Sequence, residues 1–500
     1  MPHPLLYEIN TRCWLRELSD QAGEPITLAN VPDFQFAAWQ KLGFTHLWLM
    51  GVWTTGPRAR AEALNHPGLR AACDQILPGW TEADITGSPY AVADYQVPDT
   101  LGGEAGLATF RQKLHAHGIK LVLDFIPNHL GLDHPWLSER PHLFVQSPSQ
   151  LPEIFPQETI VGLRWLAHGK DPYFPAWTDT AQLDYRLSDT YDAMIELLER
   201  IAERCDGVRC DMAMLVLNDI FVKTWERFPI ADQPPADPRP SAMDHRPPTP
   251  SSDFWGCAIF TIKQSHPDFL FLAEAYWGLE PVLKAVGFDY TYDKTLYDRL
   301  IARDAAGVQA HLLGLPPDCL AAGAHFLENH DERRIASLLS PAEHRAAALL
   351  ILALPGMRFL HQCQLRGARL HIPIQLLRRP AESGDPEIET MYEQLLTALP
   401  STAIGQGEAE LLHPRPAWQG NPTFRNFVII QWQAQPPDFD LVVVNLAPYP
   451  SQCYVPLDTA NLQADNWSLK DVLGDQHFER PSADLQTKGL YLDLPPHAAQ

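Results

Sequence analysis

Four short segments of the chain share one form, an apolar run that ends in acidic or imidazole side chains. They are LVLDFIPNH at residues 121–129, GVRCD at 207–211, FLFLAE at 269–274 and FLENHD at 326–331. An apolar run that ends in a carboxylate is typical of a buried barrel strand whose last residue faces a cleft. Three such carboxylates on three separate strands indicate acid/base and nucleophilic chemistry on a polar, uncharged substrate.

Strand-like and helix-like segments alternate from the N-terminus to about residue 380. Strands are predicted at 5–10, 45–50, 120–125, 207–211, 269–274, 288–292, 324–328 and 357–360, and helices among them at 34–42, 103–117, 192–205 and 342–354. Eight strands that alternate with helices predict a (β/α)8 TIM barrel with insertions, because a bare barrel needs only about 250 residues. A doubly wound sheet is the alternative, but no G-x-G-x-x-G sequence follows the first strand.

The barrel is expected to comprise residues 1–129 and 189–400, with an interruption after its third strand. Residues 130–188 are rich in Pro, Trp and Tyr and lack helical periodicity, which predicts an inserted subdomain over the strand ends. Residues 228–254 are rich in Pro and predict a long loop. Short β-type runs beyond residue 400 predict a C-terminal antiparallel β-sandwich domain at 401–500.

Composition limits the partners and the compartment. The formal charge is −23, so phosphate backbones and anionic membranes are poor partners, whereas a neutral sugar is indifferent to this field. No stretch reaches the roughly 18 apolar residues of a membrane span, and no secretory signal pattern opens the chain. The eight cysteines form no CxxC pair, so reduced thiols in a cytoplasmic protein are expected.

The second and third segments carry most of the chemical argument. Arg209 and Asp211 are two residues apart on one strand, so both side chains point to the same face, and the guanidinium would hold the carboxylate ionised as a nucleophile needs. Glu274 follows an apolar run and precedes Tyr276 and Trp277, a setting that raises a carboxyl pKa as a general acid needs. Retaining glycosidases place two such groups about 5–5.5 Å apart.

The sequence disfavours three other interpretations of these segments. Strand-end carboxylates can simply cap loops, and His129 and His330 taken singly are more often structural residues, but three carboxylates together disfavour that explanation. A barrel that serves only as a binding scaffold predicts the loss of at least one carboxylate, and none is missing. A metal-dependent hydrolase that uses Asp124, His129 and His330 is weaker, because no H-x-H or H-E-x-x-H pair occurs on a strand or helix.

The four segments resemble, in their order, the four signature regions of the α-amylase family of glycoside hydrolases. GSPYAVADY at 87–95 is similar to the family segment whose tyrosine stacks on the sugar, and QLDY at 182–185 resembles a motif near the end of its inserted domain. The resemblance covers most of the chain. It implies a (β/α)8 barrel with an inserted domain and a C-terminal β-sandwich, acting on α-glucans or maltooligosaccharides.

The resemblance also implies a role for each matching residue. Asp211 would be the nucleophile, Glu274 the general acid/base and Asp331 the stabiliser of the transition state. Arg209 would orient Asp211. His129 and His330 would bind sugar hydroxyls, and Tyr90 would stack on the sugar. Asp124 and Asn128 would hold the residues that contact the sugar in position. Trp277 is expected to form a wall of a sugar subsite.

The sequence departs from the family at two positions that bear on the reaction. Many amylases carry Lys-His where this chain has Met214 and Leu215, so recognition of the leaving group differs. The more apolar pair raises the alternative of an α-glucan transglycosylase. Asn128 matches a calcium ligand of many relatives, but the Leu215 position lacks the usual His, so a site without metal is expected and calcium is kept as the less favoured alternative. The expected chemistry needs no organic cofactor. Substrate length, 1,4 or 1,6 linkage and oligomeric state remain open.

Overall fold

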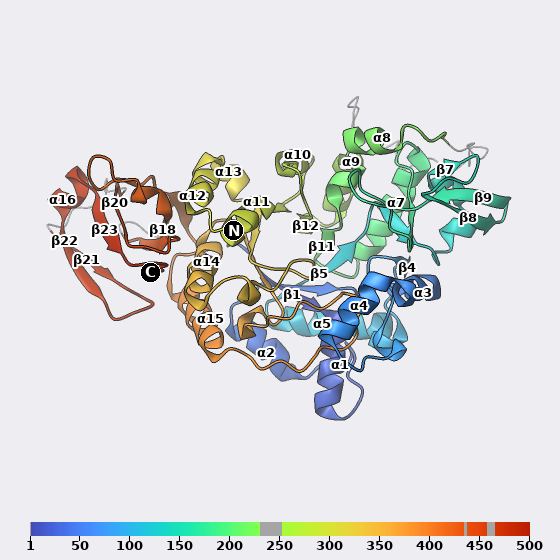
Figure 1. Cartoon of the computed structure of the whole chain (residues 1–500), viewed down its shortest axis with the longest axis horizontal. Helices are drawn as coiled ribbons and strands as arrows, with labels where there is room; N and C mark the ends of the chain where they lie inside the picture. Colours follow the sequence, from blue (N-terminus) through green and yellow to red (C-terminus); the bar gives the residue numbers. More distant parts are fainter. Residues whose placement is uncertain (1, 231–252, 435–437, 458–465) are drawn as a thin grey trace.

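Eight parallel strands close into a barrel at the centre of the molecule (Figure 1). The computed structural model describes residues 2–230, 253–434, 438–457 and 466–500, so most of the loop predicted at 228–254 lies outside the described residues. The barrel strands, in chain order, are β1 (Leu5–Asn10), β2 (His46–Met50), β5 (Lys120–Phe125), β11 (Gly207–Cys210), β12 (Leu270–Ala273), β13 (Tyr290–Tyr292), β14 (Gly323–Phe326) and β15 (Met357–His361). The predicted barrel is confirmed, and all eight predicted strands lie in it.

Alternation along the strands decides which side chains enter the barrel. One face of the strands forms an interior cluster that includes Leu6, Val122, Leu270, Leu272 and Phe326. Side chains two residues apart on a strand share a face. A residue two positions beyond an inward apolar residue therefore also faces the barrel axis. At the carboxyl ends of the strands these inward residues are polar, so the apolar interior is followed by a polar site.

Helices pack around the barrel and join its strands. They are α1 (Thr11–Ala22), α2 (Asp33–Lys41), α3 (Pro57–Asn65), α4 (Pro67–Ile76), α5 (Gly103–Ala116), α7 (Ser188–Ala202), α8 (Asn218–Trp225), α9 (Phe254–Ser265), α10 (Glu280–Ala285), α11 (Lys294–Ile301), α12 (Ala305–Gly314), α13 (Pro317–Leu320), α14 (Pro341–Ala353) and α15 (Pro386–Ala398). Helix α14 begins with a capping box in which Ser340 and Glu343 bond to each other's backbone N–H. Among the described residues, no helix has the length and apolar character needed to cross a bilayer.

The segment after β5 folds into small sheets at one end of the molecule, away from the C-terminal sheets (Figure 1). Strands β6 (His129–Gly131) and β10 (Thr180–Gln182) pair antiparallel, with His129 opposite Gln182, so the insertion leaves and rejoins the barrel at one point. Between them lie α6 (Trp136–Glu139) and a three-stranded sheet of β7 (Gln146–Ser147), β9 (Gly162–Ala167) and β8 (Ile154–Thr159). Another short pair, β3 (Thr54–Thr55) and β4 (Val92–Asp94), lies between β2 and β5 in the sequence.

The C-terminal region consists mainly of antiparallel sheets, as expected. One sheet contains β16 (Glu408–Leu411), β18 (Phe427–Gln433) and β19 (Asp440–Asn445), and another contains β17 (Arg415–Pro416), β20 (Ser451–Val455) and β23 (Leu490–Leu494). Their inner residues share one apolar cluster with Leu485 of α16 (Ser482–Thr487), so the two sheets pack face to face. Strands β21 (Asn466–Lys470) and β22 (His477–Pro481) form a separate hairpin.

The indole of Trp432 on β18 joins the C-terminal sheets to the barrel. It is fully buried, its Nε1 donates to the backbone oxygen of Ala353 at 2.7 Å, and its ring contacts His3 edge-on at 5.4 Å. Because its environment belongs to both parts of the molecule, replacement by alanine leaves a cavity between them.

We predict that Trp432→Ala lowers the free energy of unfolding by about 3–5 kcal/mol in urea denaturation. Trp418→Ala is the matched control, since that indole is 56% exposed, and we expect a change below about 0.5 kcal/mol there. Equal and small losses for both variants would show that Trp432 does not hold the two parts together.

Candidate active site

The guanidinium of Arg209, on β11, binds two predicted catalytic carboxylates at once. Its Nη1 donates to Oδ1 of Asp211 at 2.7 Å, and its Nη2 lies 2.8 Å from Oε2 of Glu274. The Nε donates to the hydroxyl of Tyr292 at 3.2 Å. A planar guanidinium presents its N–H groups in a fixed fork. Two acidic side chains from the neighbouring strands β11 and β12 are thereby held on one side of a single cation.

Arg209 is fully buried and is surrounded by aromatic rings. Its guanidinium carbon lies 5.2 Å from the ring centre of Trp48, 5.3 Å from that of Tyr90 and 5.7 Å from that of Tyr292. Aromatic faces attract a cation. Burial opposes the charge on Arg209, but the nearby Glu274 carboxylate raises the pKa of the guanidinium well above its usual range. The cation is therefore permanent, and it organises the site.

Glu274 is almost completely buried at the end of β12. Its Oε2 also accepts a hydrogen bond from the backbone N–H of Met212 at 2.6 Å, and its Oε1 accepts one from the hydroxyl of Tyr276 at 2.8 Å. Burial raises the pKa of Glu274 to about 7 despite the opposing charge of Arg209. Burial also raises the pKa of Asp211, against the same cation. Glu274 therefore holds a proton near neutral pH, as a general acid needs.

Asp331 has a different environment from the other two carboxylates. Its side chain is 46% exposed, and its Oδ2 lies 3.1 Å from Nε2 of His330. The opposite ring nitrogen, Nδ1, lies 2.5 Å from the buried carboxylate of Glu8 on β1. Burial alone would lower the pKa of His330, but the two carboxylates raise it well above its usual value. Partial desolvation opposes the charge of this half-exposed carboxyl, but the imidazolium lowers the pKa of Asp331 to about 2.

Tyr90, in the turn before β4, and Asp124, on β5, lie beside this arrangement. The Tyr90 hydroxyl lies 2.7 Å from Nε2 of His330, and the two rings stack at 5.3 Å. Asp124 accepts hydrogen bonds from the indole of Trp48 at 3.2 Å and from the N–H of Gly51 at 2.9 Å. Burial raises the pKa of Asp124 to about 7. Trp48 also contacts Arg209, so this indole lies between Asp124 and the guanidinium.

His129 and Asn128 lie where the insertion meets the barrel. The ring of His129 packs against Trp177 at 5.1 Å, and burial lowers the pKa of this imidazole to about 4, so it is neutral. The side chains of Asn128 and Gln182 pair reciprocally: Asn128 donates to Gln182 at 3.2 Å and accepts from it at 3.0 Å. The amide oxygen of Asn128 is thus already engaged within the protein.

Trp277 is exposed beside the buried acid. It is 41% exposed, its φ of 63° lies in the left-handed region, and Tyr173 of the insertion contacts it edge-on at 4.9 Å. A non-glycine residue with this φ is strained and persists only where its surroundings hold it. The structure therefore presents an aromatic surface three residues beyond Glu274, made by the barrel and the insertion together.

Met214 and Leu215 do not face this surface. Both lie in a short 3-10 turn after β11 and are buried, at 0% and 3% exposure, and Met214 packs in the main apolar core. The expectation that they make the leaving-group side apolar is therefore not supported by their placement. Instead the backbone N–H of Met212, a residue with φ of 43°, reaches Glu274.

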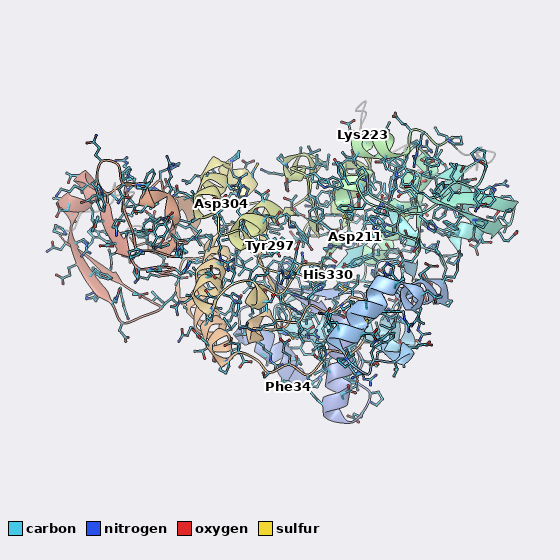
Figure 2. All side chains as sticks on the ribbon, viewed as in Figure 1. Phe34, Asp211, Lys223, Tyr297, Asp304 and His330 are labelled. Atoms are coloured by element: carbon cyan, nitrogen blue, oxygen red, sulfur yellow. The ribbon has the colours of Figure 1, made fainter. Side chains whose placement is uncertain are left out.

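The structure brings the predicted site residues to the carboxyl ends of neighbouring strands, and Figure 2 shows Asp211 and His330 in the central part of the molecule. The sequence did not predict the contributions of Glu8 and Tyr292, and it indicated Tyr276 only as part of the aromatic setting of Glu274. Glu8 did carry a signal, because it is a carboxylate within an apolar strand and lies two residues from the inward Leu6. Tyr292 carried no such signal, since aromatic residues are common in any core, and the sequence did not indicate the hydrogen bond of the Tyr276 hydroxyl.

Comparison with known proteins places the chain in a family. Residues 38–296, more than half of the chain, match the family model described as the catalytic domain of α-amylase. The chain belongs to the α-amylase family. The α-amylase MalA of Haloarcula japonica is 22% identical over 397 residues, which are 77% of this chain and 52% of that protein, so the chain spans about half the length of this curated relative. The oligo-1,6-glucosidase of Parageobacillus thermoglucosidasius is 39% identical over 51 residues, 10% of this chain and 9% of that protein.

Solved structures share the fold over nearly the whole chain. The maltogenic α-amylase AmyB of Thermotoga neapolitana has a TM-score of 0.65 at 16% identity, covering 99% of this chain and 97% of that one. The α-amylase of Geobacillus thermoleovorans, solved with acarbose, has a TM-score of 0.65 at 17% identity, with the same coverage of both chains. At these identities the likeness shows the fold.

We predict that Arg209→Met lowers the free energy of unfolding at pH 7 by about 3–5 kcal/mol, because two buried carboxylates lose their cation. Without the cation the pKa values of Asp211 and Glu274 rise further, so the loss grows as pH increases through them and is smaller at pH 4 than at pH 7. Urea denaturation at both pH values measures this. Arg16→Met, which breaks a pair whose side chains are 51% and 55% exposed, is the control and should have little effect at either pH. An equal loss for Arg209→Met at both pH values would contradict the assignment.

Proposed function

We propose that the protein is a retaining glycoside hydrolase that cleaves α-glucosidic bonds of α-glucans or maltooligosaccharides by double displacement. One observation carries the proposal: the carboxylates of Asp211 and Glu274 are bound to two nitrogens of the same buried guanidinium. Retaining enzymes need two carboxyl groups close together on either side of one bond. Membership of the α-amylase family agrees with this chemistry.

In the proposed reaction Glu274, protonated near neutral pH, gives its proton to the departing glycosidic oxygen. Asp211 attacks the anomeric carbon and forms a covalent glycosyl-enzyme. Glu274 then removes a proton from water, which attacks the same carbon and releases the sugar. Asp331, with its low pKa, stays ionised and stabilises the positive charge that develops on the sugar ring.

The remaining residues are proposed to bind the substrate. His129, neutral by burial, and His330, a cation, would bond sugar hydroxyls, and Tyr90 would stack on the sugar at the cleavage point. Trp277 and its neighbour Tyr173 offer a surface for a further sugar. The proposed reaction needs no organic cofactor. We propose no calcium ion at Asn128, because its amide oxygen accepts a hydrogen bond from Gln182.

Transglycosylation is the alternative, in which a sugar hydroxyl replaces water. Its support in the sequence was the apolar pair Met214 and Leu215, but both side chains lie in the core. We therefore favour hydrolysis. The lengths of the reaction products separate hydrolysis from transglycosylation.

The test is to incubate the protein with maltooligosaccharides, separate the products by length and follow the first-formed anomer by proton NMR. We predict shorter products only, with the α configuration retained. Products longer than the starting sugar would favour transglycosylation, and first-formed β anomers would exclude the double displacement.

Asp211→Ala tests the nucleophile in the same assay. We predict that it lowers kcat by more than about 1,000-fold, as loss of a covalent nucleophile does. Asp206→Ala is the matched control: Asp206 immediately precedes the same strand at its opposite end and bonds Arg111 and the N–H of Leu121. It should lower stability but leave kcat of the folded protein within about three-fold. Activity that survives Asp211→Ala would contradict the assignment.

The pH dependence of kcat/KM tests the pair of carboxyl groups. The reaction needs Glu274 protonated and Asp211 ionised. Activity should therefore fall as pH rises through about 7, and it should also fall at acid pH, with a midpoint above the ordinary 3.8 of an aspartic acid. Glu274→Gln should abolish the alkaline limb in the residual activity. A flat profile between pH 6 and 9 in the wild-type protein would contradict Glu274 as the acid.

A further inference from the structure

The two oxygens of Glu274 have different partners, and the difference decides where the proton lies. Oε2 accepts the N–H of Met212 at 2.6 Å and lies 2.8 Å from Nη2 of Arg209. Both partners can only donate. The N–H of Met212 donates to Oε2, and the Arg209 cation beside Oε2 opposes a proton on that atom, so the acidic proton of Glu274 belongs on Oε1.

Within the described part of the chain, the hydrogen-bond partner of Oε1 is the hydroxyl of Tyr276, at 2.8 Å. A hydroxyl can donate and accept. It can accept from Oε1 when Glu274 is protonated, and it can donate to Oε1 when Glu274 is ionised. The same contact therefore serves both states of the acid/base.

We propose that Tyr276 is a positioning residue for the proton transfer: its hydroxyl holds Oε1 of Glu274 toward the glycosidic oxygen and donates to that atom once the proton has left. The inference rests on the proposed glycosidase function. Trp277, the residue after Tyr276, has a strained backbone conformation, and its ring contacts Tyr173 of the insertion. This contact restricts the chain next to Tyr276.

Over the two steps Glu274 gives up one proton and takes one back. In the first step the proton moves from Oε1 to the glycosidic oxygen, the bond from the anomeric carbon to that oxygen breaks, and a bond to Asp211 forms. Tyr276 keeps its own proton and rotates it toward the new carboxylate. In the second step Oε1 takes a proton from water, whose oxygen bonds to the anomeric carbon as the bond to Asp211 breaks. Tyr276 is then again free to accept.

Tyr276→Phe separates this role from simple packing, because it keeps the ring and removes the hydroxyl. A hydroxyl that donates to the ionised form favours that form, so its loss should raise the pKa of Glu274 and move the alkaline limb of kcat/KM upward by about one pH unit. On maltotriose we predict a fall in kcat/KM of roughly 10- to 100-fold. On 4-nitrophenyl α-glucoside, whose leaving group departs without a proton, we predict a fall below about three-fold.

Tyr191→Phe is the matched control, since it removes the hydroxyl of another buried tyrosine, one that donates to Asn218 at 3.1 Å. This variant should change neither the alkaline limb of kcat/KM nor the ratio of kcat/KM between maltotriose and 4-nitrophenyl α-glucoside. Equal losses on both substrates in Tyr276→Phe, with an unmoved limb, would overturn the proposal and leave a packing role.

A second measurement does not depend on turnover. The C=O infrared band of protonated Glu274, assigned by its absence in Glu274→Gln, should titrate at higher pH in Tyr276→Phe than in the wild type. A shift in a protein that cleaves no glucan would refute the proposed function but support the hydrogen bond. An unshifted band would overturn the inference about Tyr276 whatever the activity.

Discussion

The site depends on one buried cation that two acidic side chains share. Removing a guanidinium from water is costly, and only close anionic and aromatic partners offset that cost. Arg209 pairs with the carboxyl groups of Asp211 and Glu274, and aromatic rings lie against its guanidinium. Without either carboxylate the cation would be left under-compensated, so the same interaction that stabilises the barrel end also holds two reactive groups together.

Burial and neighbouring charges give the carboxyl groups different pKa values. Glu274 is buried beside an apolar strand and its pKa rises to about 7, whereas exposed Asp331 beside the imidazolium of His330 has a pKa of about 2. The charge of His330 depends on Glu8, at the far side of its ring. Neighbouring environments that push pKa values apart let one site contain both an acid and permanent anions.

The order of the strands and the positions of the carboxylates could be predicted from the sequence, because barrel strands are apolar runs and side chains alternate between faces. What could not be predicted depends on distant contacts. The pairing of His330 with Glu8 joins residues 322 positions apart. Similarly, Met214 was expected to make the leaving-group side apolar, but it lies in a short turn after β11 with its side chain buried in the core. The expected domain boundaries and the roles of the site residues remain predictions.

The central claim is that Asp211 becomes covalently bonded to the sugar while Glu274 stands beside the same carbon. The most direct measurement is to trap the intermediate with a 5-fluoro-α-glucosyl fluoride, digest the protein and locate the label by mass spectrometry. The account predicts one added fluoroglucosyl group on the peptide that carries Asp211, at the carboxylate itself. A label on another carboxylate, or turnover of the reagent without any labelled peptide under saturating conditions, would contradict it.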